Sequence, residues 1–277
     1  MGASLRLAGL RLTGGKRSLD LDVRPGQMLA LAGPAEEARL FLAAVAGETR
    51  LAEGRAEHGG PWLAPKDLAG RKPTLAGLGG RKTPSDQQER LAQAITDLGL
   101  WDHRSTVVGE LPPTAQALAR LVPCLAEPEG VLALDSEFDC LDPWAAERLQ
   151  TAIQRFRKRG GIVVHASGRA DFLERADLLV VLQGLEVAFA GPLEALWRKV
   201  GDQTVEVTTN NAPAVRALVE PFQVQVTETQ EGLRLEAAEG QALAARLLRD
   251  GYGDVRYVVV RRPGLLDAIR AVVRPSG

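Results

Sequence analysis

The sequence lacks a charge excess, a cysteine framework and, at its start, a long apolar run. Its 34 basic side chains nearly balance 35 acidic ones, which excludes a bulk attraction to nucleic acid or to an anionic membrane. The two cysteines, Cys124 and Cys140, have no metal-ligand spacing. The opening MGASLRLAGLRLTGG has no apolar stretch typical of a signal peptide or membrane span. We therefore expect a cytoplasmic protein with reduced thiols and no nucleic-acid partner.

The chain has enough apolar residues for a sizeable core. Of its 277 residues, 45% are hydrophobic and 25% are charged, which is the profile of a soluble globular protein. This length predicts one large domain or two modest ones.

In the first part of the chain, apolar strands alternate with helices. Strands are expected at 4–12, 18–23, 28–32, 131–134, 162–164 and 178–182, and helices at about 36–46, 85–100, 114–125, 143–158 and near 171. Residues 48–85 are rich in Gly, Pro, Arg and Lys and show no pattern that assigns an element. Apolar strands alternating with helices predict a parallel sheet covered on both faces.

The pattern of strands and helices changes at residue 203. The remaining chain reads as strand, helix, two strands, helix and strand, followed by a closing helix at 265–273. This order predicts a separate α+β domain with the ferredoxin-like motif, over residues 203–277.

Five spaced segments resemble the ATPase subunit of an ABC transporter. Four of them, at 24–34, 98–111, 131–143 and 177–193, fall within a match that covers about residues 1–200. The fifth, Arg262-Pro263-Gly264-Leu265-Leu266 in the closing domain, resembles the C-terminal extension of exporters with ABC-2 type permeases. The resemblance implies a P-loop NTPase core of the ABC ATPase type, with a helical subdomain at about 62–125.

The segment Gly33-Pro34-Ala35-Glu36-Glu37-Ala38-Arg39-Leu40 stands where the family has its phosphate loop, or Walker A motif. Such a loop needs glycine N–H groups, a Lys for the phosphates and a hydroxyl on Mg²⁺. By position, Glu36 replaces a motif glycine, Arg39 the Lys and Leu40 the hydroxyl residue. The two carboxylates would repel a triphosphate by a few kcal/mol. They also suit a helix N-terminus as first-turn acids, and Arg39 with that N-terminus could alternatively form an unusual anion site.

The segment matching the Walker B strand keeps its carboxylate, Asp135, but Ser136 follows where the family has its general-base Glu. A neutral hydroxyl cannot take a proton from water at pH 7 without a base of its own. Glu137 could substitute, although one residue further on it should point to another face. Asp135 is otherwise interpreted as a local cap or ion-pair partner at the strand end.

Other family positions are altered as well. No aromatic residue precedes Phe41 to stack on adenine, and Lys66 falls where the family has its loop Gln. Pro112 and Pro113 occupy the signature motif, where prolines supply no N–H donors. Ser167 occupies the switch-histidine site, and His165 is either a displaced switch or a strand-end residue.

We therefore expect a non-hydrolytic ABC transporter ATPase-like subunit without catalytic residues or metal, which binds ATP and Mg²⁺ weakly or not at all. Its vestigial positions are Gly33, Glu36, Arg39, Leu40, Lys66, Pro112, Asp135, Ser136, Asp142 and Ser167. The expected partner is an ABC-2 type membrane permease, which would hold the protein on the inner face of the cell membrane. A second, active ABC ATPase or self-association are further options.

Two alternatives remain open: a weak ATPase whose site is completed by a partner chain, and a soluble regulator without a permease. For docking on a permease we expect the region 62–112, with Trp62 and Trp101 either in the interface or in the local core. For self-association we expect the closing domain, where strands at 205–208 and 224–226 could offer edges. Because both the Walker A and signature segments are altered, pairing with a competent ATPase should spoil both composite sites.

Overall fold

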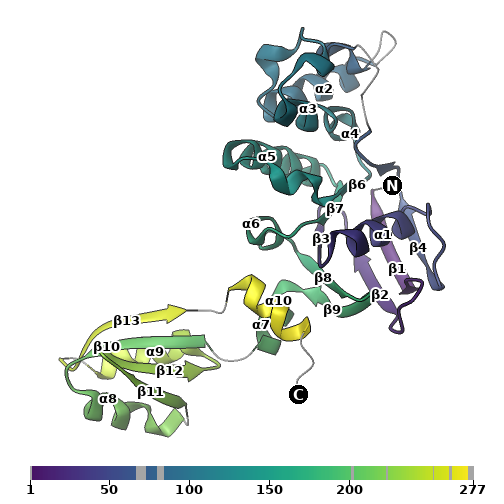
Figure 1. The fold of residues 1–277 in the computed structure, drawn as a ribbon. Helices are drawn as coiled ribbons and strands as arrows, with labels where there is room; N and C mark the ends of the chain where they lie inside the picture. Colours follow the sequence, from purple (N-terminus) through teal and green to yellow (C-terminus); the bar gives the residue numbers. More distant parts are fainter. Residues whose placement is uncertain are drawn as a thin grey trace. The chain divides into compact units, whose positions relative to one another are not determined.

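A computed structural model describes residues 2–66, 73–79, 84–200, 203–222, 224–251, 253–261 and 264–273. Arg262 and Pro263, which contributed to the resemblance, lie outside this part of the chain. The chain forms two compact units, Met1–Leu193 and Glu194–Gly277 (Figure 1). The division falls a little before the 200–203 boundary placed from sequence, because the helix α7 (Leu193–Val200) had not been predicted.

A six-stranded sheet forms the centre of the first unit. Its order is β5 (Trp62–Leu63), β6 (Val131–Leu134), β7 (Ile162–Ala166), β3 (Met28–Ala32), β8 (Leu178–Gln183) and β9 (Glu186–Pro192). The first five strands are parallel and β9 is antiparallel to β8. Every residue of β3, β6 and β7 is buried, because both faces of the sheet are covered. The predicted α/β class is therefore confirmed.

Different layers cover the two faces of this sheet. On one face, α1 (Ala35–Val45) shares a core with the three-stranded antiparallel sheet of β2 (Leu19–Val23), β1 (Ser4–Arg11) and β4 (Glu53–Gly59). α5 (Pro143–Lys158) packs on β7, and α6 (Ala170–Leu173) packs on β3. Loops at the carboxyl ends of β3, β6 and β7 therefore meet along one edge, where ligands bind in open α/β sheets.

The helical region differs from prediction in two places. The expected helix at 114–125 is broken into α3 (Pro113–Ala119) and α4 (Val122–Ala126), because Pro123 lacks the N–H that a continuous helix would need. α2 (Ser85–Asp97) begins at Ser85, so Pro84 rather than Ser85 holds the N-cap position. The described part of the region also contains 3-10 helices at Leu75–Gly79, Trp101–His103 and Val108–Glu110.

The second unit has the predicted element order. After β10 (Gln203–Thr209) come α8 (Ala212–Val219), β11 (Gln225–Thr229), β12 (Gly232–Ala237), α9 (Gly240–Asp250), β13 (Val255–Arg261) and α10 (Leu265–Val273). The antiparallel sheet has the order β11-β12-β10-β13, and its core lies on the face covered by α8 and α9 (Figure 1).

One expectation about the sheet edges is wrong. The strand at 205–208 is part of β10, which pairs with β12 on one side and β13 on the other, so it offers no edge. The crossover through α8 inserts β10 between the later strands. Only β11 and β13 are edge strands in the described sheet of this unit.

Candidate nucleotide site

The loop after β3 keeps the tight backbone of a phosphate loop at one position. Gly33 has a φ of 150°, and a Cβ there would lie 2.7 Å from the carbonyl oxygen of Leu182. Only glycine fits this close approach. Pro34 then occupies the N-cap position of α1 without any side-chain acceptor. The close approach at Gly33 thus fixes the backbone at the start of this loop, and no side chain caps the helix that follows.

Arg39 joins the start of α1 to the end of β6. Its Nε donates to Oδ2 of Asp135 at 2.8 Å, and its Nη1 lies 3.2 Å from Oε1 of Glu36. The hydrogen bond and charge of Asp135, followed by the charge of Glu36, raise the pKa of Arg39. The cation that stands at the family's Lys position is therefore already paired within the chain.

Asp135 is engaged from three sides. Besides Arg39, the backbone N–H of Glu137 donates to Oδ1 at 2.8 Å and the Ser136 hydroxyl donates to the same oxygen at 3.2 Å. Burial acts to raise the pKa of this carboxyl, but the hydrogen bonds and the Arg39 charge outweigh it and lower the pKa. Asp135 is thus an ionised local cap and ion-pair partner.

Glu37 points away from the position expected from sequence. Its two carboxylate oxygens accept the backbone N–H groups of Gly184 and Leu185, each at 3.0 Å, in the turn between β8 and β9. Leu185 has a φ of 64°, and these bonds hold it in that disfavoured conformation. The expectation of two free carboxylates in the phosphate position is therefore wrong: Glu37 braces a turn, and Glu36 is paired with Arg39.

Glu186 extends this bracing to the loop between β1 and β2. Its carboxylate accepts the backbone N–H groups of Lys16 at 2.6 Å and Arg17 at 3.1 Å. A Cβ at Gly15 would lie 2.6 Å from the carbonyl oxygen of Leu185, so the loop lies directly on the turn. Sequence reasoning missed Glu186, since its partners lie 169 and 170 residues away.

Glu137 forms an ion pair with Arg120. Its Oε2 lies 2.8 Å from Nη1 of Arg120, whose Nε donates to the carbonyl oxygen of Lys66 at 3.3 Å. The Lys66 side chain itself is exposed. Glu137 is therefore held by Arg120 at the place where a substitute base was considered.

A second polar cluster ties the loops after β6 and β7 together. The Asp139 carboxylate accepts the Ser167 hydroxyl at 2.6 Å and the Gly168 N–H at 2.7 Å. Nη1 of Arg169 donates to the carbonyl oxygen of Leu141 at 2.8 Å. Ser167, predicted at the switch position, is thus a structural hydrogen-bond donor, and sequence reasoning missed its acceptor Asp139.

Asp142 caps α5, because its Oδ1 accepts the backbone N–H of Ala145 at 2.9 Å.

At the signature position, Pro112 is the N-cap residue of α3 and Pro113 its first residue. The free carbonyl of Leu111 is instead satisfied by the Gln116 side chain at 2.7 Å. These residues form an ordinary helix start without exposed N–H groups from either proline.

His165 is fully buried within β7. Its ring packs edge-on against Phe172, with ring centroids 4.8 Å apart, and neither ring nitrogen has a hydrogen-bond partner among the described residues. Burial lowers the pKa of His165 to about 4, so the ring is neutral at pH 7. His165 is a core residue and not a displaced switch.

A shallow hollow lies in the helical region. It has a volume of about 310 Å³ and is lined by Ala76 together with residues of α2 and by Trp101 and Arg104. The Trp101 side chain is 44% exposed and Arg104 stacks over its ring at 5.0 Å. Trp62, in contrast, is half-buried in β5 and packs against the core of the unit. Of the two tryptophans considered for docking, Trp101 lines this hollow and is partly exposed, whereas Trp62 packs against the core.

The residues at this site do not fit Mg-ATP. Leu40, which is 44% exposed, offers no oxygen to a cation, and Arg39 is bound to the carboxylate that would share the metal. No group of three or more metal-ligating side chains occurs among the described residues. None of the described helices is long and apolar enough to cross a membrane.

Comparison with known proteins gives a consistent picture of the fold. No protein-family model matches the chain. It is 24% identical over 250 residues to the phosphonates import ATP-binding protein PhnC of Maricaulis maris, covering 74% of this chain and 92% of that protein. It is 26% identical over 192 residues to an uncharacterized ABC transporter ATP-binding protein of Alkalihalophilus pseudofirmus, covering 62% and 68%.

Among solved structures, the chain is similar to an ATP-binding cassette of an ABC transporter in its ADP conformation. The TM-score is 0.55 at 15% identity, with 69% of this chain and 92% of that chain covered. The chain thus has the fold of an ABC transporter ATP-binding domain, with sequence similarity to ATP-binding proteins of such transporters.

Proposed function

We propose that the chain is a non-hydrolytic ABC transporter subunit, which keeps the ATP-binding-domain scaffold for assembly and no longer turns over ATP. The observation that carries this proposal is the 2.8 Å ion pair between Arg39 and Asp135. This ion pair joins the segment at the phosphate-loop position to the segment at the Walker B position. The Arg39 and Asp135 side chains therefore bind each other instead of a phosphate and a metal ion.

The energetics favour loss of nucleotide binding. A micromolar affinity corresponds to roughly 8 kcal/mol, and each charged hydrogen bond that a nucleotide site supplies contributes about 1.5–3 kcal/mol. Leu40 removes the hydroxyl contact to the metal, and Arg39 must leave Asp135 before it can serve a phosphate. Losing two contacts of this size, about 3–6 kcal/mol, weakens a micromolar affinity to about 100 μM or weaker.

The same network supports a scaffold role. Glu37, Glu186 and Asp139 each accept two backbone or hydroxyl donors from a loop distant in sequence. These hydrogen bonds fasten loops to one another that lie far apart in the sequence. A fixed surface of this kind suits a subunit that holds partners together.

For the partner, we propose a membrane permease of the ABC-2 type, as the C-terminal resemblance implies, with the protein held on the inner face of the membrane. Docking uses the helical region, where the hollow beside Trp101 can accept an apolar side chain of a helix. Co-purification in mild detergent tests this, with Trp101→Ala expected to lose the permease. Trp144→Ala is the matched control, since Trp144 is 75% exposed at the start of α5.

A membrane protein that copurifies equally with both variants would contradict docking at the hollow. If no membrane protein accompanies the wild-type chain, a free-standing soluble regulator becomes the better account.

The second candidate is a weak ATPase whose site is completed by a partner chain, favoured by the names of the sequence relatives as ATP-binding proteins. Phosphate release from the purified assembly separates the two. The scaffold proposal expects the rate to be unchanged by Arg39→Ala or Asp135→Asn in this chain. A rate that collapses with either variant supports the second candidate.

A further inference from the structure

Hydrogen bonds tie the helices of the helical region to one another. Within the described part of 73–127, Nε of Arg90 in α2 donates to the carbonyl oxygen of Ala126 in α4 at 2.7 Å. Nε2 of Gln87 in α2 donates to Oε1 of Glu127, just after α4, at 3.2 Å. α2 and α4 are thus joined directly, and neither of these bonds involves a residue of the sheet.

One face of α5 carries three arginines that contact this region. Arg148, Arg155 and the C-cap residue Arg159 recur seven and four residues apart, a spacing that places them on one side of a helix. The Arg148 guanidinium lies against Gly99, just after α2, where an added Cβ would be 2.5 Å from Nη1. Nη2 of Arg159 donates to the carbonyl oxygen of Leu125 in α4 at 2.6 Å. These three arginines, here called the basic stripe of α5, therefore face α2 and α4.

Asp97, the last residue of α2, is an acidic partner of the basic stripe. Its Oδ2 lies 3.1 Å from Nε of Arg155, and its Oδ1 accepts Nε2 of Gln93 at 2.8 Å. Burial and the charge of Arg90 lower the pKa of Arg159, whereas the charge of Asp97 acts to raise it. Asp97 therefore offsets the repulsion among arginines of α2 and α5 that meet at this junction.

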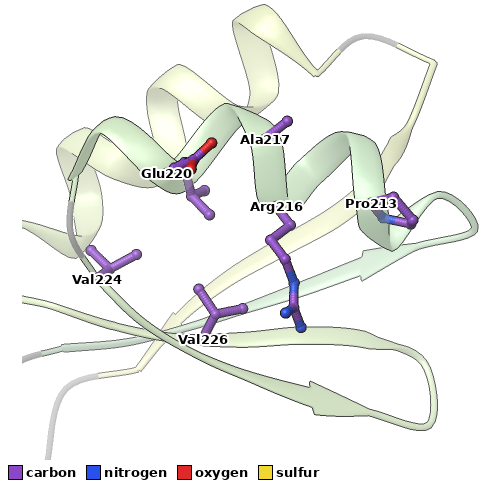
Figure 2. A pocket seen from close by; sticks show the side chains of 7 residues that line it. Pro213, Arg216, Ala217, Glu220, Val224 and Val226 are labelled. Carbon is purple, nitrogen blue, oxygen red and sulfur yellow. The ribbon is translucent and has the colours of Figure 1, made fainter.

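Burial distinguishes this ion pair from an exposed one. The Asp97 side chain is 8% exposed and that of Arg155 is 46% exposed. In the second unit, Arg216 borders a groove of about 530 Å³ (Figure 2) and pairs with Glu228 through side chains that are 52% and 68% exposed. An exposed pair contributes little, whereas removing one partner of a buried pair leaves a poorly hydrated charge. Loss of the Asp97 charge should therefore weaken the junction far more than loss of an exposed carboxylate.

We propose that the basic stripe and Asp97 form a clasp between α5 and the helical region, and that this region opens from the sheet as one unit when the clasp is released. Regions joined to the rest of a protein by few contacts open locally, at a lower free energy than global unfolding. β3 and β7, in contrast, are each paired on both sides within the sheet. Since Leu91 and Ile95 of α2 line the hollow beside Trp101, the clasp sets where this hollow stands relative to the sheet.

Hydrogen exchange of the full-length chain in low concentrations of urea tests this opening. Amides of α2 and α4 should share one opening free energy and a smaller urea dependence than amides of β3 and β7, because a local opening exposes less surface. Asp97→Asn removes the charge with little change of shape, and should accelerate exchange in α2 and α4 about tenfold. Asp86→Asn is the matched control, since Asp86 pairs with Arg90 inside α2 and its side chain is 67% exposed. This control should accelerate exchange by about twofold or less.

A second variant removes the same ion pair from the side of α5. Arg155→Gln should accelerate exchange in α2 and α4 by about the same factor as Asp97→Asn. The double variant should exchange no more than about twofold faster than either single variant, because both changes remove one interaction. The proposal would be overturned if the α2 and α4 amides followed the urea dependence of β3 and β7. Equal acceleration by Asp97→Asn and Asp86→Asn, or none by Arg155→Gln, would overturn it as well.

Discussion

Glu36 and Glu37 provide an internally controlled test of what the first turn of α1 contributes to the fold. Both lie in the first turn of α1, so both gain about the same 0.3–1 kcal/mol from the helix dipole. Glu37 additionally accepts two backbone N–H groups from the β8–β9 turn, whereas Glu36 makes only an ion pair in which its side chain is 84% exposed. The two adjacent residues therefore differ mainly in those two hydrogen bonds.

Glu37→Ala should cost about 2 kcal/mol, since two net hydrogen bonds of about 1 kcal/mol each are lost. Glu36→Ala should cost about 0.5 kcal/mol beyond the shared dipole contribution, because an exposed ion pair contributes little. At roughly 2–4 °C per kcal/mol, the melting temperatures of the two variants should differ by about 3–6 °C.

Thermal unfolding followed by circular dichroism measures this difference. Hydrogen exchange at the amides of Gly184 and Leu185 gives a local readout, and only Glu37→Ala should accelerate it. Equal destabilisation by the two variants, with equal exchange at the turn, would refute the bracing role of Glu37.

The remaining predictions concern the other altered positions. Arg39→Lys or Ser136→Glu alone should produce no phosphate release above background in a coupled assay, because residues of one catalytic unit act non-additively; a measurable rate would show that a single residue blocks catalysis. His165 binds a proton in the unfolded chain below pH 6.5 but in the folded chain only below about 4. The free energy of unfolding should thus be unaffected by this group above pH 6.5 and should fall by about 3 kcal/mol as the pH drops to 4; urea titrations of wild type and His165→Phe measure it, and equal pH dependence would contradict the assignment. Asp139→Asn should cost about 1–3 kcal/mol in the same titrations because Asn can accept from only one of the two donors. Asp171→Asn, which loses only the 2.8 Å ion pair of the exposed Asp171 carboxylate with Arg169, should cost less than about 1 kcal/mol. The reverse order of costs would argue against the cluster at Asp139.

The parts of the fold that sequence predicted are those with a local signal. α5 was predicted with its observed bounds, because Asp142 supplies an N-cap oxygen and Pro143 suits the first helical position. The buried strands β3 and β6 are short continuous apolar runs, which mark a strand covered on both faces. β4 was missed because its side chains are mostly exposed and polar, so it shows neither alternation nor an apolar run.

The interactions at the site could not be predicted in the same way. Arg39 and Asp135 were each singled out by position in a motif, but they lie 96 residues apart and nothing local indicates that they pair. The Glu37 side chain points toward the turn between β8 and β9, whose Gly184 N–H group lies 147 residues further along the chain. Sequence therefore singled out these residues by position, and the structure was needed to find what they contact.

Titration calorimetry of the purified chain with Mg-ATP tests the central claim most directly. Because Arg39 is paired with Asp135 and Leu40 offers no oxygen, we predict no binding heat at concentrations that saturate ordinary ATP-binding cassettes. A dissociation constant tighter than about 10 μM, equivalent to roughly 7 kcal/mol, would contradict the account.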